Sequence, residues 1–311
     1  MFQHIPVLAD EVISHLAVQP GGKYADGTLG GGGHARLLLE ASAPDGQLIG
    51  TDRDEIALAA ARENLAEYGS RLLSFHANYT ELAGFIKTHY ADGADGILLD
   101  IGVSSPQIDT PSRGFSYMHD APLDMRMDQT CGQSAKDLIN TLPQADLRRI
   151  IQEYGEEKWA VRIADIICER RALAPIETTF QLVDVIERAI PKGAREKDTH
   201  VAKRTFQAFR IATNDELGAL EKAIDDLAGA LKTGGRLAII TFHSLEDRIV
   251  KNKFKYLAAS CICPPKLPVC TCDKVSEVRI ITRKPVTAGQ YELKNNRRAA
   301  SAKLRVVEKI I

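Results

Sequence analysis

The order of apolar and helical segments is the feature that most constrains the fold of this chain. In the first hundred residues, short apolar runs alternate with longer stretches that have helical spacing. The apolar runs that predict strands are Lys23–Thr28, Gln47–Thr51, Leu72–His76 and Gly96–Asp100. The stretches that predict helices are His34–Ala41, Glu55–Tyr68 and Thr80–Tyr90. This alternation is typical of βαβ units and predicts an α/β fold with a parallel sheet.

The middle of the chain breaks this alternation. Strand signals nearly disappear, and the helical stretches there are Ala145–Tyr154, Glu156–Arg171 and Thr179–Ile190, the last capped by Thr178. The α/β pattern then returns with a helix from Asp215 to about Lys232, capped by Asn214, and with strands at Arg236–Phe242, Val278–Thr282 and Lys303–Val307. We therefore expect one sheet built from residues 1–108 and 207–311, with residues 109–206 inserted as an all-helical, substrate-recognition domain.

Composition places the chain among ordinary globular proteins, with 44% hydrophobic and 26% charged residues. The first residues lack the basic and apolar regions of a signal peptide, and no apolar run is long enough to span a membrane. We therefore expect a cytoplasmic protein without a membrane partner.

Charge is distributed unevenly along the chain. The net charge is only −1, yet residues 248–311 contain 15 Lys and Arg against 4 Asp and Glu, a net charge of +11. A basic C-terminal fifth on an acidic body indicates a surface that faces a polyanion. Charged side chains that merely solvate the surface remain the alternative.

The segment Asp26–His34, DGTLGGGGH, is the strongest local signal, because it connects an expected strand to an expected helix. Glycines allow close approach of a ligand to the backbone, and a helix start offers free N–H donors. Asp52 ends the next strand, where a carboxylate can accept hydrogen bonds from ribose hydroxyls. Both a nicotinamide dinucleotide and S-adenosylmethionine fit this pattern. The acids Asp26 and Asp100 favour S-adenosylmethionine, which carries an ammonium and a sulfonium but no phosphate.

Three polar segments follow the strand that ends at Asp100: Asp100–Gln107, Arg113–Tyr117 and Pro122–Met127. Their mixture of Asp, Arg and Met suits a functional loop better than a core, although a salt-bridged connector would also explain it. His243 opens the polar segment after the strand Arg236–Phe242 and is expected to contact the base or a phosphate, with a structural role as the alternative. Candidate phosphate contacts are Arg204, Arg210, Asn296, Arg297 and Arg298.

Four of the six cysteines form the pattern Cys261-x-Cys263 followed by Cys270-x-Cys272. Four thiolates suit tetrahedral zinc, but zinc sites usually have two residues between the paired cysteines. Reduced thiols therefore remain the alternative, and we assign no metal from the sequence.

Motifs distributed over nearly the whole chain resemble the bacterial 16S rRNA cytosine-N4 methyltransferase family (RsmH, also called MraW). They are DGTLGGGGH, DRD, LLDIGVSSPQ, RGFSY, PLDMRMD, RTFQAFRI, TFHSLEDRIVK and NNRRAASAKLRV. The resemblance implies a class I, Rossmann-like methyltransferase sheet with a helical insertion, and S-adenosylmethionine as cofactor. It also implies methylation of N4 of a cytidine in the decoding centre of 16S rRNA, with the small ribosomal subunit and no DNA as partner. The cofactor contacts that it implies are Gly32, Gly33, His34, Asp52, Tyr79, Asp100 and Gln107.

The chemistry requires a group that accepts hydrogen bonds from the cytosine amine, because the N4 lone pair is delocalised into the ring. Candidates for this role are Asp100, Asp124 and the backbone of residues 102–106, and His243 is a further catalytic candidate. Two other protein classes remain open. A dehydrogenase would use the same glycine signal, and an RNA-binding ribosome-assembly protein could retain the fold without catalysis.

Overall fold

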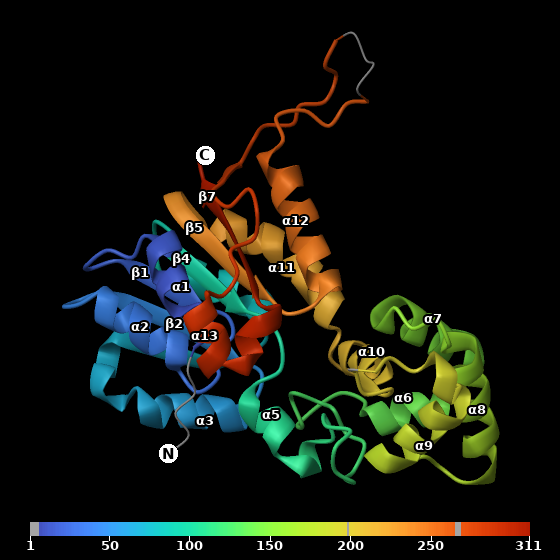
Figure 1. The fold of residues 1–311 in the computed structure, drawn as a ribbon. Coiled ribbons are helices and arrows are strands. Elements are labelled where there is room, and N and C mark those ends of the chain that lie inside the picture. Colours follow the sequence, from blue (N-terminus) through green and yellow to red (C-terminus); the bar gives the residue numbers. More distant parts are fainter. Residues whose placement is uncertain (1–5, 198, 265–268) are drawn as a thin grey trace. The chain divides into compact units, whose positions relative to one another are not determined.

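The structure is a computed structural model that describes residues 6–197, 199–264 and 269–311 (Figure 1). The chain forms two compact units. The first comprises residues 1–102 and 217–311, and the second comprises residues 103–216. The expected boundaries at 108/109 and 206/207 need correction, because they would cut through two helices of the second unit, α5 (Ser105–Asp109) and α10 (Lys203–Asn214).

The described residues of the first unit form a seven-stranded sheet with the order β3-β2-β1-β4-β5-β7-β6. The strands are β1 (Lys23–Asp26), β2 (Gln47–Asp52), β3 (Leu72–His76), β4 (Ala94–Asp100), β5 (Leu231–Thr241), β6 (Val278–Ile280) and β7 (Lys303–Lys309). Strands β1 to β5 pair in parallel, whereas β7 is antiparallel to both β5 and β6. The strand order reverses between β1 and β4, which is where open α/β sheets bind ligands.

Helices cover both faces of this sheet. They are α1 (Ala9–Leu16), α2 (Gly33–Ala41), α3 (Glu55–Asn64), α4 (Leu82–His89), α11 (Glu216–Ala230), α12 (Ser244–Ala258) and α13 (Gln290–Asn295), and the first residue of α11 belongs to the second unit. Ile97 and Leu99 pack with α4, α11 and α12 on one face, whereas Leu98 packs with α1, α2 and α3 on the other. This alternation follows from the two-residue period of a strand, and burial on both faces explains why the three consecutive residues Ile97, Leu98 and Leu99 of β4 are all apolar.

The second unit has its own core. Besides α5 and α10 it contains α6 (Ala135–Thr141), α7 (Gln144–Gly155), α8 (Ala160–Leu173) and α9 (Thr179–Ala189). Apolar side chains of α6 to α10 form one buried cluster together with Leu123 and Met125. The expected helical character of the middle of the chain is confirmed, and Thr178 caps α9 as expected, with its side chain accepting a hydrogen bond from the amide of Gln181.

Two local expectations are wrong. Asn214 ends α10 and does not cap α11, because its side chain hydrogen-bonds to the backbone of Met125, Met127 and Arg210. The helix expected to reach about Lys232 ends at Ala230, since Leu231 is buried and already pairs with β4. Glycine lets β5 pass the edge of β4 closely, because a Cβ on Gly235 would lie 2.5 Å from the carbonyl oxygen of Ala94.

The sequence predicts no membrane-spanning segment, and the structure bears on this prediction through its helices. Among the helices that the structure describes, none combines the length and the apolar character needed to cross a bilayer.

Candidate functional site

Two glycines of the turn between β1 and α2, Gly27 and Gly32, cannot be replaced by a larger residue without strain. A Cβ on Gly27 would lie 2.3 Å from Cδ2 of Leu99, so the backbone here lies directly on β4. Gly32 has φ +86°, and a Cβ there would meet Leu65 at 2.8 Å. The turn is therefore held close to the carboxyl ends of the strands, with Gly32 as N-cap of α2.

Asp26 and Asp100 lie at the ends of the adjacent strands β1 and β4, and Thr28 connects them. Oδ1 of Asp26 accepts hydrogen bonds from the amide and the hydroxyl of Thr28, at 3.0 and 3.3 Å. The Thr28 hydroxyl oxygen in turn accepts a 2.7 Å hydrogen bond from the amide of Asp100. Sequence reasoning did not select Thr28, although a threonine two residues after an aspartate is a recognised turn signal.

Burial governs the charge of Asp26. Its side chain is almost completely buried, and this burial raises the pKa of Asp26 to about 6, although the charge of His34 and the hydrogen bonds from Thr28 act to lower it. The surroundings of Asp26 therefore stabilise its negative charge too weakly to offset the cost of burying it. Such perturbed groups in a ligand-binding position are typical of functional sites.

His34 lies in the first turn of α2 and faces Asp100. Its Nε2 atom is 3.6 Å from Oδ2 of Asp100. Burial acts to lower the pKa of His34, but the neighbouring carboxylates Asp100 and Asp26 outweigh it and hold this pKa above its usual value. Within the described part of the first unit, both ring nitrogens of His34 and Oδ1 of Asp100 are buried without a hydrogen-bond partner. Buried polar atoms are rarely left unsatisfied, so this cluster is prepared for a polar ligand.

Asp52 ends β2 and holds the glycine turn. Its Oδ2 accepts a 2.7 Å hydrogen bond from the amide of Gly30, and its Oδ1 accepts one of 2.8 Å from the amide of Asp54. Burial raises the pKa of Asp52, although both amides act to lower it. Each carboxylate oxygen has a second lone pair, so Asp52 can still accept hydrogen bonds from a ligand.

Tyr79, the remaining expected cofactor contact of the first unit, is buried and packs with the core on the α4 side of the sheet. Its Cβ would be 2.8 Å from a Cβ on Gly27, which places the base of this side chain beside the glycine turn. The structure thus brings the turn, Asp26, His34, Asp100 and Tyr79 together at the carboxyl edge of β1 and β4.

These residues fit S-adenosylmethionine better than a dinucleotide. The partnerless Oδ1 of Asp100 and the poorly compensated charge of Asp26 call for hydrogen-bond donors and positive charge, whereas the ring N–H groups of His34 call for an acceptor such as the carboxylate of this cofactor. Three acids around a glycine turn would repel a pyrophosphate, whereas they attract an ammonium and a sulfonium. Gly32 and Gly33 would lie against the cofactor, and Asp52 would hold its ribose.

His243 follows β5 as the N-cap of α12, and both nitrogens of its ring lie close to Glu246. Its Nδ1 accepts a hydrogen bond from the amide of Glu246, and its Nε2 lies 3.0 Å from Oε1 of Glu246. Oε2 of Glu246 accepts hydrogen bonds from the amides of His243 and Phe242, at 3.2 and 2.8 Å. The reciprocal pattern is a capping box, so His243 has a structural task whatever else it does.

Gln107 and Asp124 belong to the second unit. Gln107 is buried in α5, and its side chain accepts a 3.0 Å hydrogen bond from the amide of Ser104 in a capping box. Arg126 holds Asp124 through two 2.9 Å hydrogen bonds. Burial acts to raise the pKa of Asp124, but the hydrogen bonds from Arg126 outweigh it and lower this pKa.

Arg113 joins the two polar motifs of the second unit, which the sequence did not reveal. Its Nη2 donates to the carbonyl oxygens of Arg126 and Met127, at 3.0 and 2.8 Å. Gly114 has φ +73°, and a Cβ there would lie 2.4 Å from the carbonyl oxygen of Pro122. The hydrogen bonds of Arg113 and the close packing at Gly114 thus hold this loop in one conformation.

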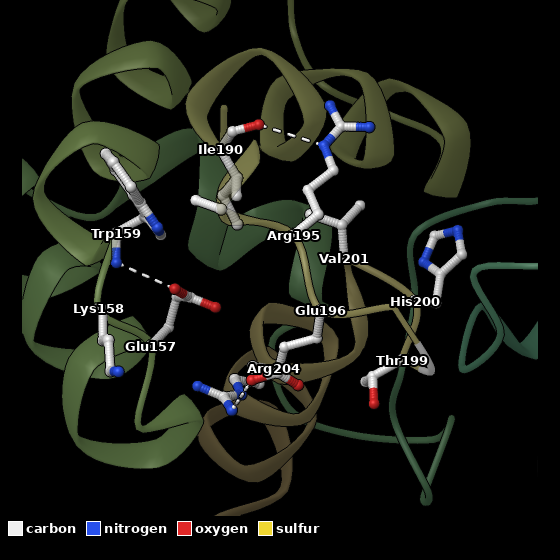
Figure 2. A pocket seen from close by; sticks show the side chains of 11 residues that line it. Glu157, Lys158, Trp159, Ile190, Arg195, Glu196, Thr199, His200, Val201 and Arg204 are labelled. Atoms are coloured by element: carbon white, nitrogen blue, oxygen red, sulfur yellow. Dashed lines mark hydrogen bonds and ion pairs between the residues drawn. The ribbon is translucent and has the colours of Figure 1, made fainter. Parts of the chain in front are cut away.

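Two expected phosphate contacts are engaged with carboxylates of the second unit. Arg210 forms two 2.8 Å hydrogen bonds with Glu216, and Arg204 pairs with Glu196 at 2.6 Å. Arg204 also lines a pocket of about 100 Å³ together with Glu157, Trp159, Arg195 and His200 (Figure 2).

The strand order β3-β2-β1-β4-β5-β7-β6, with an acidic glycine turn after β1, defines a Rossmann-like fold of the class I methyltransferase type. The chain belongs to the MraW methylase family, whose model matches residues 1–310.

Relatives in two bacteria carry the name Ribosomal RNA small subunit methyltransferase H. That of Citrifermentans bemidjiense is 58% identical over 309 residues, covering 99% of each chain. That of Clostridioides difficile is 52% identical, also covering 99% of each chain. Among solved structures, an rRNA methylase from Streptococcus thermophilus has 10% identity and a TM-score of 0.41, covering 97% of this chain and 94% of that chain. So distant a likeness carries no conclusion, and the fold class rests on the strand order.

Proposed function

We propose that this chain transfers the methyl group of S-adenosylmethionine to N4 of a cytidine in the decoding centre of 16S rRNA. Its membership in a methylase family supports methyl transfer. Relatives named as small-subunit rRNA methyltransferases support ribosomal RNA of the small subunit as substrate. The small ribosomal subunit is then the partner, and the bacterial cytoplasm is the compartment in which they meet.

One observation carries the proposal: the cluster of Asp26, His34 and Asp100 beside the glycine turn. His34 and Asp100 are 3.6 Å apart and keep buried atoms without partners, and the pKa of Asp26 is raised to about 6. Positive charge and N–H donors on a ligand would satisfy Asp26 and Asp100, and a carboxylate on the same ligand would accept hydrogen bonds from the ring of His34. The cofactor, when bound, supplies an electrophilic methyl group on its sulfonium.

The residues of the first unit that hold the cofactor in this proposal are Gly32, Gly33, His34, Asp52, Tyr79 and Asp100, and the family resemblance adds Gln107 of the second unit. Asp52 accepts hydrogen bonds from the ribose hydroxyls, because only one lone pair of each oxygen is used by Gly30 and Asp54. Tyr79 contributes its ring beside the turn. Gln107 contributes through its amide, which α5 holds in place.

The acceptor amine needs orientation more than it needs a strong base. A hydrogen bond from the amine to a carboxylate localises electron density on N4 and aligns its lone pair with the methyl group. Asp100 is the first candidate for this acceptor, because its Oδ1 is buried and free of partners in the described first unit. Asp124 is the second candidate, and its lowered pKa keeps it ionised. His243 acts by positioning the segment after β5.

The test is transfer of labelled methyl from S-adenosylmethionine to small ribosomal subunits, followed by nucleoside analysis of the rRNA. Label in N4-methylcytidine supports the proposal. Asp100→Asn keeps the size of the side chain but removes its charge, and we expect turnover to fall on the order of 10²-fold or more. Asp92→Asn, at an exposed acid just before β4, is the matched control and should retain full activity.

Two results would contradict the proposal in different ways. Cofactor binding in calorimetry without label in any RNA would mean that the acceptor is wrong. Binding of small subunits without cofactor binding or methyl transfer would indicate a non-catalytic ribosome-assembly protein.

A further inference from the structure

The segment between α12 and β6 leaves the sheet as an extended excursion, which we call the arm, residues 259–264 and 269–277 (Figure 1). Its base is fixed to the rest of the first unit. The amide of Glu277 donates a 2.9 Å hydrogen bond to the carbonyl oxygen of Leu257, and the Ser276 hydroxyl donates to that of Ala258 at 3.0 Å.

Beyond its base the arm has no hydrophobic core. None of its described residues is fully buried, and none belongs to any of the three core clusters. Ile262, Val269 and Val275 are even largely exposed. A segment that buries so little apolar surface needs another source of order, and bound metal is a common one in small elements.

The arm instead brings four cysteine sulfurs together. The Sγ atoms of Cys261, Cys263, Cys270 and Cys272 all lie within 4.8 Å of one another. Cys270 is 3.5 Å from Cys261, 3.9 Å from Cys263 and 3.6 Å from Cys272, and Cys272 is 3.7 Å from Cys261. In a tetrahedral site with Zn–S bonds of about 2.3 Å, neighbouring sulfurs are about 3.8 Å apart. The four sulfur–sulfur distances given above, 3.5 to 3.9 Å, lie on both sides of this value.

The backbone supports negative charge on these sulfurs. The amide of Ile262 donates to Sγ of Cys272 at 3.3 Å, that of Cys263 donates to Cys261 at 3.4 Å, and that of Thr271 donates to Cys263 at 3.4 Å. Backbone amides of both C-x-C segments thus donate hydrogen bonds to sulfurs of the cluster. Hydrogen bonds to the charged form favour thiolates, but four thiolates this close would repel one another without a cation between them.

The positions of the four sulfurs do not fit two disulfide bonds. A disulfide joins two sulfurs at about 2.05 Å, which would divide the cluster into two short pairs. The four sulfurs instead have similar separations, and all four cysteines are free.

We propose that Cys261, Cys263, Cys270 and Cys272 bind one zinc ion, which orders the arm. Four thiolates leave no open position, so this is a structural site and not a catalytic one. The proposal does not depend on methyl transfer, because metal binding and activity are measured separately.

Metal analysis of the full chain, purified under reducing conditions without chelator, tests the proposal. We expect one zinc per chain, released when a mercurial reagent modifies the thiols. Cys263→Ser and Cys270→Ser should each lose at least nine-tenths of the zinc. Cys131→Ser, which removes an exposed cysteine outside the cluster, is the matched control and should retain it.

Two further measurements keep the proposal testable if a variant folds poorly. Cobalt added to metal-free wild-type protein should give the absorption of a tetrahedral thiolate site. Limited proteolysis should cut the arm faster after zinc is removed, with the sheet intact. The proposal is overturned if reduced wild-type protein neither contains zinc nor competes for it with a chromophoric chelator. Stoichiometric iron, or the intact mass of a chain with two disulfides in place of metal, would also overturn it.

Discussion

At the scale of single residues, Asp26 makes the site sensitive to pH. Its pKa is raised from 3.8 to about 6, so its ionised form destabilises the ligand-free protein. Relative to low pH, where Asp26 is protonated in both folded and unfolded chains, stability is lost as the pH rises through about 6. A cationic ligand favours the ionised form, so its binding should gain strength over the same range.

Asp26→Asn separates these two effects, because an amide oxygen can still accept hydrogen bonds from Thr28. We expect the ligand-free variant to be more stable than wild type at pH 8 but not at pH 4, by on the order of 2–3 kcal/mol. We also expect weaker binding of S-adenosylmethionine, with less dependence on pH between 5 and 8. Thermal unfolding and calorimetry at a series of pH values check both expectations. A variant that is less stable than wild type at pH 8 would contradict the assigned cause of the pKa shift.

Gly32 and Gly31 form a matched pair within one turn. Gly32→Ala requires a strained φ and a contact of 2.8 Å with Leu65, whereas a Cβ on Gly31 finds its nearest neighbour only at 4.0 Å. We expect Gly32→Ala to cost on the order of 1–3 kcal/mol of stability and to weaken cofactor binding at least tenfold. Gly31→Ala should change stability much less. Equal effects of the two substitutions in thermal unfolding and calorimetry would refute this account.

At the scale of residues, the sequence predicted the acidic side chains of the site but not the residues whose hydrogen bonds join separate segments. Asp26, Asp52 and Asp100 could be predicted because each ends an apolar strand beside a possible ligand site. Thr28 and Arg113 could not, since their hydrogen bonds join segments whose proximity only the fold establishes. The partner of Arg210 was missed for a different reason, because Glu216 lies in the next helix and charge alone does not reveal pairing.

At the scale of elements, the cap of α9 is a small and testable source of stability. The Thr178 side chain accepts from the amide of Gln181, and the Gln181 side chain accepts from the amide of Thr178. Thr178→Ala should destabilise the start of α9 by about 1 kcal/mol, whereas Thr178→Ser should restore most of it. Hydrogen exchange of the first amides of α9 measures this locally. Unchanged exchange in the alanine variant would show that the cap contributes nothing.

Element boundaries could be predicted where a capping residue marks them, but not where tertiary packing decides them. The start of α9 was correct because Thr178 marks it. The end of α11 was missed by two residues, because the double glycine that signalled a helix end lies inside β5. Tertiary packing overrides the local signal there, since Leu231 is buried against the sheet.

At the scale of the whole molecule, the C-terminal charge predicts how the proposed binding of RNA depends on salt. With a net charge of +11 in residues 248–311, binding should weaken as salt rises, with a slope near −0.7 per phosphate contacted on single-stranded RNA. Binding of S-adenosylmethionine should change little over the same range. Lys294→Glu, on exposed α13, should lower RNA affinity several-fold and flatten the slope, whereas Lys87→Glu, exposed on α4, should not. Anisotropy titrations at several potassium chloride concentrations would refute this if both variants behaved alike.

The discontinuous sheet has a consequence for how the chain is made. Strand β4 is complete at Asp100, but its neighbour β5 begins only at Leu231, and β7 follows at Lys303. During synthesis at roughly 5–20 residues per second, β4 therefore waits on the order of ten seconds before its partner emerges from the ribosome. An open strand edge pairs readily with other chains, so the nascent protein passes through a period of vulnerability that the finished molecule no longer shows.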